Sequence, residues 1–87
     1  MISVPKLDCR VVLRPGLTPS QRLALMEVVE KWALALTTSK PTKMVADSNH
    51  LLFVVNLDRQ TASETLRACL PAELVREVFL GGVSWNA

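Results

Sequence analysis

The sequence predicts a two-layer α+β fold, because one local plan is used twice along the chain. The first copy is a strand-like stretch, Leu7 to Arg14, followed by helix-start residues at Thr18 to Gln21. The second is an apolar run, Leu51 to Leu57, followed through Asp58 by helix-start residues at Thr61 to Glu64. Two strand–helix units in 87 residues suit one sheet layer packed on one layer of helices.

The first strand alternates in polarity, which predicts one buried face and one open face. The apolar set consists of Leu7, Cys9, Val11 and Leu13. The positions between them hold Asp8, Arg10, Val12 and Arg14. A period of two is the spacing of a half-buried strand. We expect the cysteine-bearing side to face the helices and the arginine-bearing side to face outward.

The first helix is expected to begin after Thr18, whose hydroxyl suits an N-cap. Pro19 fits the first helical position, and Gln21 can complete a capping box. The stripe expected to face the sheet consists of Leu25, Val28, Val29, Trp32, Ala33 and Leu36. Leu23 and Leu34 fall on the opposite side and are expected to be exposed. The stretch from Thr37 to Pro41 ends this helix.

Two strands are expected in the middle of the chain. Lys43 to Asp47 predicts a short strand, and the turn-forming residues up to His50 connect it to the longer run from Leu51 to Leu57. That run is apolar at almost every position, so it belongs in the middle of a sheet or against a partner.

The last third is predicted as a helix, a second helical piece and a closing strand. Thr61 with Glu64 predicts a cap, and the residues expected to turn inward are Leu66, Cys69 and Leu70. Pro71 interrupts the helix and starts a further helical piece. The inward residues of that piece are expected to be Leu74, Val75, Val78 and Phe79. Gly81-Gly82 ends it, and Val83 to Asn86 forms the closing strand.

These elements predict a single α+β domain over residues 1–87 with a βαββαβ order. Right-handed crossovers through the two helices place the first and third strands at the centre of a four-stranded antiparallel sheet. Both helices then lie on one face, with the second helix interrupted at Pro71. The expected fold is a ferredoxin-like two-layer sandwich.

Composition points to a cytoplasmic protein without a membrane span. Met1 to Val4 is followed closely by Pro5 and Asp8, which does not fit a secretory leader, and no apolar run is long enough to span a bilayer. Cys9 and Cys69 are expected to be buried free thiols. The net charge of +2 divides into +4 over residues 1–43 and −2 over residues 44–87.

No catalytic, cofactor or metal signature is apparent in the sequence. His50 is the only histidine, and its spacing from the two cysteines matches no zinc motif. We therefore expect no cofactor and no metal. The start of the first helix is one candidate anion site, with Arg14 and Arg22 supplying charge.

The outer sheet face is the strongest candidate for function. Val12, Leu52 and Val54 are expected to form an apolar patch on it, bordered by Arg10, Arg14 and Asn56. Exposed apolar patches with polar borders usually mark interfaces. We therefore expect self-association as a homodimer, or a protein partner in an assembly, with Leu23 and Leu34 as further exposed apolar residues.

Two alternatives use other chemistry. One is binding of nucleic acid through Arg10, Arg14 and the basic front half, but the outer face is expected to lack the aromatic residues on which bases stack. The other is a small enzyme or small-molecule binder whose pocket cannot be recognised in the sequence.

Overall fold

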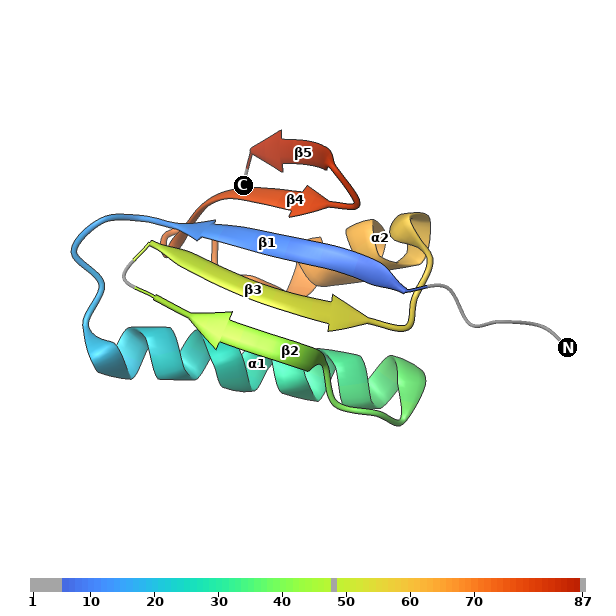
Figure 1. Cartoon of the computed structure of the whole chain (residues 1–87). Helices are drawn as coiled ribbons and strands as arrows, with labels where there is room; N and C mark the ends of the chain where they lie inside the picture. Colours follow the sequence, from blue (N-terminus) through green and yellow to red (C-terminus); the bar gives the residue numbers. More distant parts are fainter. Residues whose placement is uncertain (1–5, 48, 87) are drawn as a thin grey trace, which may run out of the picture.

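The computed structural model describes residues 6–47 and 49–86 and confirms the α+β class (Figure 1). Its strands are β1 (Leu7–Leu13), β2 (Thr42–Ala46), β3 (His50–Val55), β4 (Val75–Leu80) and β5 (Val83–Asn86). Its helices are α1 (Pro19–Thr37) and α2 (Arg59–Cys69). The first six elements therefore follow the βαββαβ order that the sequence predicts, and β5 comes after them.

The strands form one antiparallel sheet in the order β2-β3-β1-β4-β5. Strand β1 lies in the middle, hydrogen-bonded to β3 on one side and to β4 on the other. Figure 1 shows α1 and α2 both behind the sheet, so its front face carries no helix. This arrangement is the predicted ferredoxin-like sandwich, enlarged by a strand beyond β4.

The two long inner strands turn the expected sides toward the helices. In β1 the buried residues are Leu7, Cys9, Val11 and Leu13. In β3 the buried residues are Leu51, Phe53 and Val55. The residues between them are exposed or half-buried on the front of the sheet. The pleat of both strands therefore has the predicted orientation.

Helix α1 begins at the predicted capping box. The backbone N–H of Gln21 donates to the Thr18 hydroxyl at 3.2 Å, and the Thr18 N–H donates to the Gln21 side chain at 2.9 Å. Pro19 occupies the first turn, where its missing N–H costs no intrahelical bond. The helix ends at Thr38, which adopts the left-handed region with φ of 60°.

The inner face of α1 packs on the sheet through Leu25, Val29, Trp32 and Ala33. The Trp32 ring meets Phe53 of β3 edge to face, and its indole N–H donates to the Thr65 hydroxyl of α2 at 2.8 Å. The expectation that Leu36 is buried is wrong, because its side chain is 41% exposed. Leu36 lies in the last turn of α1, which extends past the start of β2 in Figure 1.

Helix α2 begins three residues earlier than expected, because Asp58 and not Thr61 is its N-cap. The Asp58 carboxylate accepts from the Thr61 backbone N–H at 2.9 Å. Ala62 and Leu66 form the buried side of the helix. Cys69 is exposed in the final turn, which overturns the expectation of a buried thiol there. Within the described residues, neither helix is long and apolar enough to cross a membrane.

The stretch after Pro71 is a strand and not the expected continuation of the helix. After a turn at residues 71–74, β4 pairs with β1. Val12 pairs with Glu77 but Leu13 pairs with Val75, so Arg76 is an extra residue on β4 and forms a β-bulge. The bulge separates the buried residues Val75 and Val78 by three positions, which is the spacing of a helix.

The Gly81-Gly82 pair is a hairpin turn and not a helix stop. Both glycines have positive φ, 58° and 88°, and they join Leu80 of β4 to its partner Val83 of β5. A two-residue turn of this kind suits the twist of antiparallel strands. The predicted strand at Val83–Asn86 is therefore present, but its neighbour is β4 and not the first strand.

Strand β2 is the outermost strand on the side of the sheet away from β5. Its register against β3 shifts between Thr42 and Val45. Lys43 lies in this irregular part and has a positive φ of 53°, which is uncommon for a residue with a side chain. The backbone of β2 is therefore kinked where a regular strand would continue the ladder.

The cap of α1 provides a test of the helix start. Replacing Thr18 by Ala removes the acceptor for the Gln21 N–H, so we expect the free energy of unfolding to fall by about 1 kcal/mol. Urea denaturation followed by circular dichroism measures this change. The matched control is Ser20→Ala, an exposed hydroxyl in the same turn that is not part of the capping box. Equal stability of Thr18→Ala and wild type would contradict the role of the cap.

Candidate functional site

The front of the sheet, which we call the outer face, is the candidate site. It consists of the outward residues of β1, β3 and β4 with Val45 of β2: Asp8, Arg10, Val12, Val45, His50, Leu52, Val54, Glu77 and Phe79. The strand register arranges these residues in rows that run across the strands. The rows therefore show which side chains are neighbours.

The central row is apolar on both sides of one arginine. Leu52 and Phe79 are the cross-strand partners of Arg10, and Val45 is the partner of Leu52. Val45 is 56% exposed and Leu52 is 38% exposed, so two neighbouring apolar side chains are open to solvent. The row therefore presents apolar surface to solvent at the middle of the sheet.

The flanking rows carry charge of the opposite sign. On one side Asp8 lies opposite Val54. On the other side Val12 lies between His50 and Glu77. Arg10 is thus followed in both strand directions by a row that contains a carboxylate. The outer face is a mixed-charge surface and not a basic one.

The predicted interface residues separate into three groups. Val12, Leu52, Val54 and Arg10 lie together on the outer face. Arg14 and Asn56 lie past the ends of β1 and β3 and are exposed. Leu23 and Leu34 are exposed, as expected, but they belong to α1 in the other layer of the fold. The structure therefore brings only the first group into one surface.

Phe79 is the residue of this surface that the sequence prediction placed wrongly in the core. Its neighbours Val78 and Leu80 are buried, and Phe79 is half-buried on the opposite side of the strand. The Arg10 guanidinium lies over its ring at 5.5 Å from the centroid, which is a cation–π contact. The glycine pair after Leu80, a hairpin signal when it follows a strand, was the available clue.

A shallow depression of about 260 Å³ lies on the outer face between the central row and the Asp8 row. Its lining residues are Asp8, Cys9, Arg10, Leu52, Phe79 and Gly82. It is open to solvent and bordered by an acid, a base and two apolar side chains. The depression is therefore suited to receiving a side chain from outside the molecule.

The Cys9 thiol does not supply a nucleophile to this depression. Its side chain points to the core, and its sulfur lies 3.5 Å from the Leu7 carbonyl oxygen. Burial, with a smaller contribution from the Asp8 carboxylate, raises the pKa of Cys9 to about 12. The thiol is therefore protonated at neutral pH, and a thiol in that state is a poor nucleophile.

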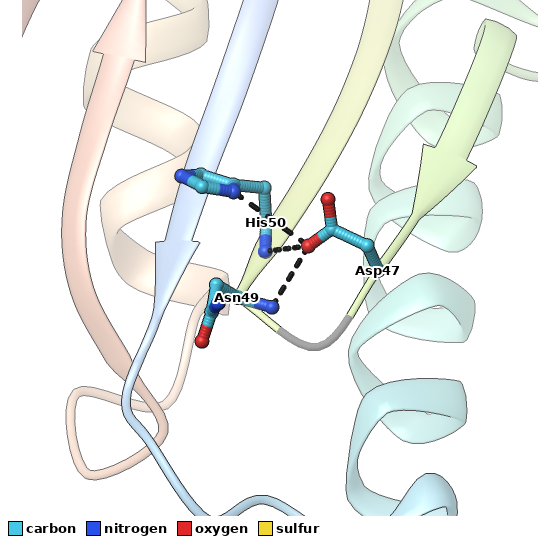
Figure 2. A network of polar contacts seen from close by, with 3 residues as sticks. All are labelled: Asp47, Asn49 and His50. Carbon is cyan, nitrogen blue, oxygen red and sulfur yellow. Dashed lines mark hydrogen bonds and ion pairs between the residues drawn. The ribbon is translucent and has the colours of Figure 1, made fainter.

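His50 lies at the border of the outer face and is held by the turn before β3. Figure 2 shows the Asp47 carboxylate directed at the backbone N–H groups of Asn49 and His50, which donate to it at 2.8 and 2.7 Å. The imidazole Nδ1 lies 3.6 Å from the same carboxylate. The carboxylate therefore holds the backbone of Asn49 and His50 at the start of β3 and lies beside the imidazole.

The two arginines of the predicted anion site bond to different backbone carbonyls. The Arg14 Nε donates to the Ala72 oxygen at 3.4 Å, and an Arg22 guanidinium N–H donates to the Leu17 oxygen at 2.9 Å. The N–H of Gln21 is already bonded to Thr18. The anion site remains a prediction from the sequence. In the described ranges, no cluster of three or more His, Cys, Asp or Glu residues is placed to hold a metal.

Comparisons of the chain with protein-family models, with curated proteins and with solved structures found no match.

Two carboxylates that accept backbone N–H bonds make stability depend on acid. Hydrogen bonds from Asn49 and His50 lower the pKa of Asp47, and bonds from Thr61 lower the pKa of Asp58. A lowered pKa in the folded state gives stability that is present above the unfolded value of 3.8 and is lost as the pH falls through the folded value. We therefore expect stability to decrease as the pH falls from about 5 to about 2.

The double variant Asp47→Asn, Asp58→Asn isolates this effect, because each amide oxygen still accepts the backbone bonds but does not titrate. Urea denaturation at several pH values should show a shallower acid-induced loss of stability than in wild type. The comparison at pH 7 is the control for any effect of the substitutions that is independent of titration. Parallel curves for the variant and wild type would contradict the assignment.

Proposed function

We propose that this protein is a non-catalytic interaction protein that associates with a second copy of itself through the outer face. The observation that supports this function is the central row, where exposed Leu52 and half-buried Phe79 flank Arg10 on a sheet face that carries no helix. A two-layer fold covers only one side of its sheet, so the apolar residues of the other side gain from a partner.

The mixed charge of the outer face favours a copy of the same chain over a polyanion. Asp8 and Glu77 occupy the rows on either side of Arg10, so they repel a phosphate backbone that approaches it. A surface with charges of both signs around an apolar centre is complementary to itself. Isologous dimers require this property, because the same patch is used on both subunits.

The size of the face sets the strength of the association that we expect. Five strands about 4.8 Å apart and about 20 Å long give a face on the order of 500 Å² on each copy. A total of about 1,000 Å² is at the low end for specific protein interfaces. We therefore expect a weak, concentration-dependent dimer.

Sedimentation equilibrium across a range of protein concentrations tests this proposal. The average mass of wild type should rise from 9.6 kDa toward twice that value as concentration increases. Leu52→Asp places a charge in the central row and should keep the mass near 9.6 kDa throughout. The matched control is Leu23→Asp on α1, which makes the same change at an exposed leucine in the other layer and should behave as wild type.

Circular dichroism confirms that both variants remain folded. A wild-type protein that stays monomeric up to about 1 mM would refute the dimer, because an interface of this size should be occupied at that concentration. If single-stranded RNA bound to the same face at low salt while the protein stayed monomeric, nucleic-acid binding would replace self-association as the proposed function.

A further inference from the structure

We infer that Arg10 of each copy forms an ion pair with Asp8 of the other copy, across a two-fold axis that crosses β1 near Cys9. This inference rests on the proposed function, which it deepens by fixing how the two outer faces meet. In this arrangement the Arg10–Asp8 pair orients the two copies, and the apolar residues beside it supply the buried contact area.

The first observation is that these two charges lie on the same face of the same strand. Asp8 and Arg10 are separated by one residue on β1, the middle strand of the sheet, and both are exposed. The ion pairs found among the described residues are Lys40–Glu30 and His50–Asp47, and they include neither charge. Both groups are therefore available to a partner.

The second observation is that one two-fold axis satisfies the charges and the apolar residues together. Consider a two-fold axis that lies between the two sheets and crosses the strands at Cys9. Rotation about this axis reverses the strand direction, so residues equally far from Cys9 on its two sides face each other. Arg10 therefore lies over Asp8 of the second copy. Leu52 is the register partner of Arg10 and Val54 is that of Asp8. The same operation therefore brings Leu52 over Val54 of the second copy.

On the β4 side the same axis brings Phe79 over the turn formed by Gly81 and Gly82. Arg10 is paired with Phe79, and Cys9 with Leu80, so the position after Leu80 is level with Asp8. The Gly81 N–H also donates to the Asp8 carbonyl oxygen at 2.9 Å. Glycines have no side chain to obstruct an aromatic ring, so the surfaces are complementary here too.

The third observation is that the depression lies where this axis would cross β1. It is bordered by Asp8 and Arg10, with Leu52 and Phe79 on its sides. Packed sheets are separated by about 10 Å, a gap that a long arginine and a short aspartate span together. The Arg10 side chain of the second copy would enter the depression and meet Asp8, and contact with Phe79 orients each arginine beforehand.

An axis one row further along β1, at Val11, gives a worse match. It would place Arg10 over Val12 of the second copy and Phe79 over Glu77. Arg10 and Glu77 would then face apolar groups and lose water without gaining a partner, and the one match of opposite charges would be Asp8 over Arg14, beyond the end of β1. The axis near Cys9 is therefore the better match, because it gives Arg10 an opposite charge within β1 at both symmetric positions.

Charge reversal tests the inference with sedimentation equilibrium or fluorescence titration. Arg10→Glu places two acids opposite each other at both symmetric positions, and Asp8→Arg places two bases there. Each variant alone should dimerise at least about tenfold more weakly than wild type. An equal mixture of the two should form a heterodimer whose dissociation constant is within about threefold of wild type, because both pairs are then opposite in sign.

The matched control is Arg14→Glu, the same change just beyond β1, which should alter the dissociation constant by less than about threefold. Circular dichroism checks that all variants are folded. If wild type dimerises and Leu52→Asp disrupts it, but the mixed variants do not associate, the Arg10–Asp8 pair is wrong while the proposed function stands. If Glu77→Arg, and not Asp8→Arg, restored dimerisation of the Arg10→Glu variant, the Arg10–Asp8 pair would also be wrong. A monomeric wild type overturns both.

Discussion

Hydrogen bonding of β1 to a strand on each side is the constraint on which both faces of this sheet depend. Because β3 and β4 hold it, the pleat of β1 is fixed, and Val11 is fully buried while Arg10 is exposed. A register slip of one residue would move Asp8 and Arg10 into an apolar core that contains no buried polar side chain among the described residues. Core packing and the charge pattern of the outer face are therefore two results of one alignment.

The parts of the fold that were predictable from sequence are those where a regular period survives. Leu7 to Leu13 alternates without interruption, so the buried and outward sets of β1 follow directly from the residue types. The stretch around Arg76 was not predictable in this way, because the bulge shifts the alternation and gives Val75 and Val78 a helical spacing. That error placed Phe79 in the core. Phe79 is the only outward aromatic residue described on the central row, and it was therefore missing from the predicted site.

The helix boundaries show a second limit, which concerns competition between similar residues. Asp58 and Thr61 are both good N-caps, and Glu64 makes a capping box with Thr61 plausible. The fold uses Asp58, because it follows β3 closely and its carboxylate reaches the Thr61 N–H. Cys69 and Leu36 were expected inside since they match the apolar stripes, but both lie in the final turn of their helix and are exposed there. Periodicity gives the direction of a side chain but not whether a neighbour is present there.

The kink at Lys43 limits the ways in which copies of this chain can assemble. A straight edge strand offers a row of free N–H and C=O groups, on which other chains can be templated into fibrils. The left-handed backbone at Lys43 interrupts that row on β2. Lateral growth of the sheet is thus hindered at this edge, whereas the proposed contact between two outer faces would use both faces and close the assembly. The irregular strand therefore disfavours an open-ended polymer that would grow from the β2 edge.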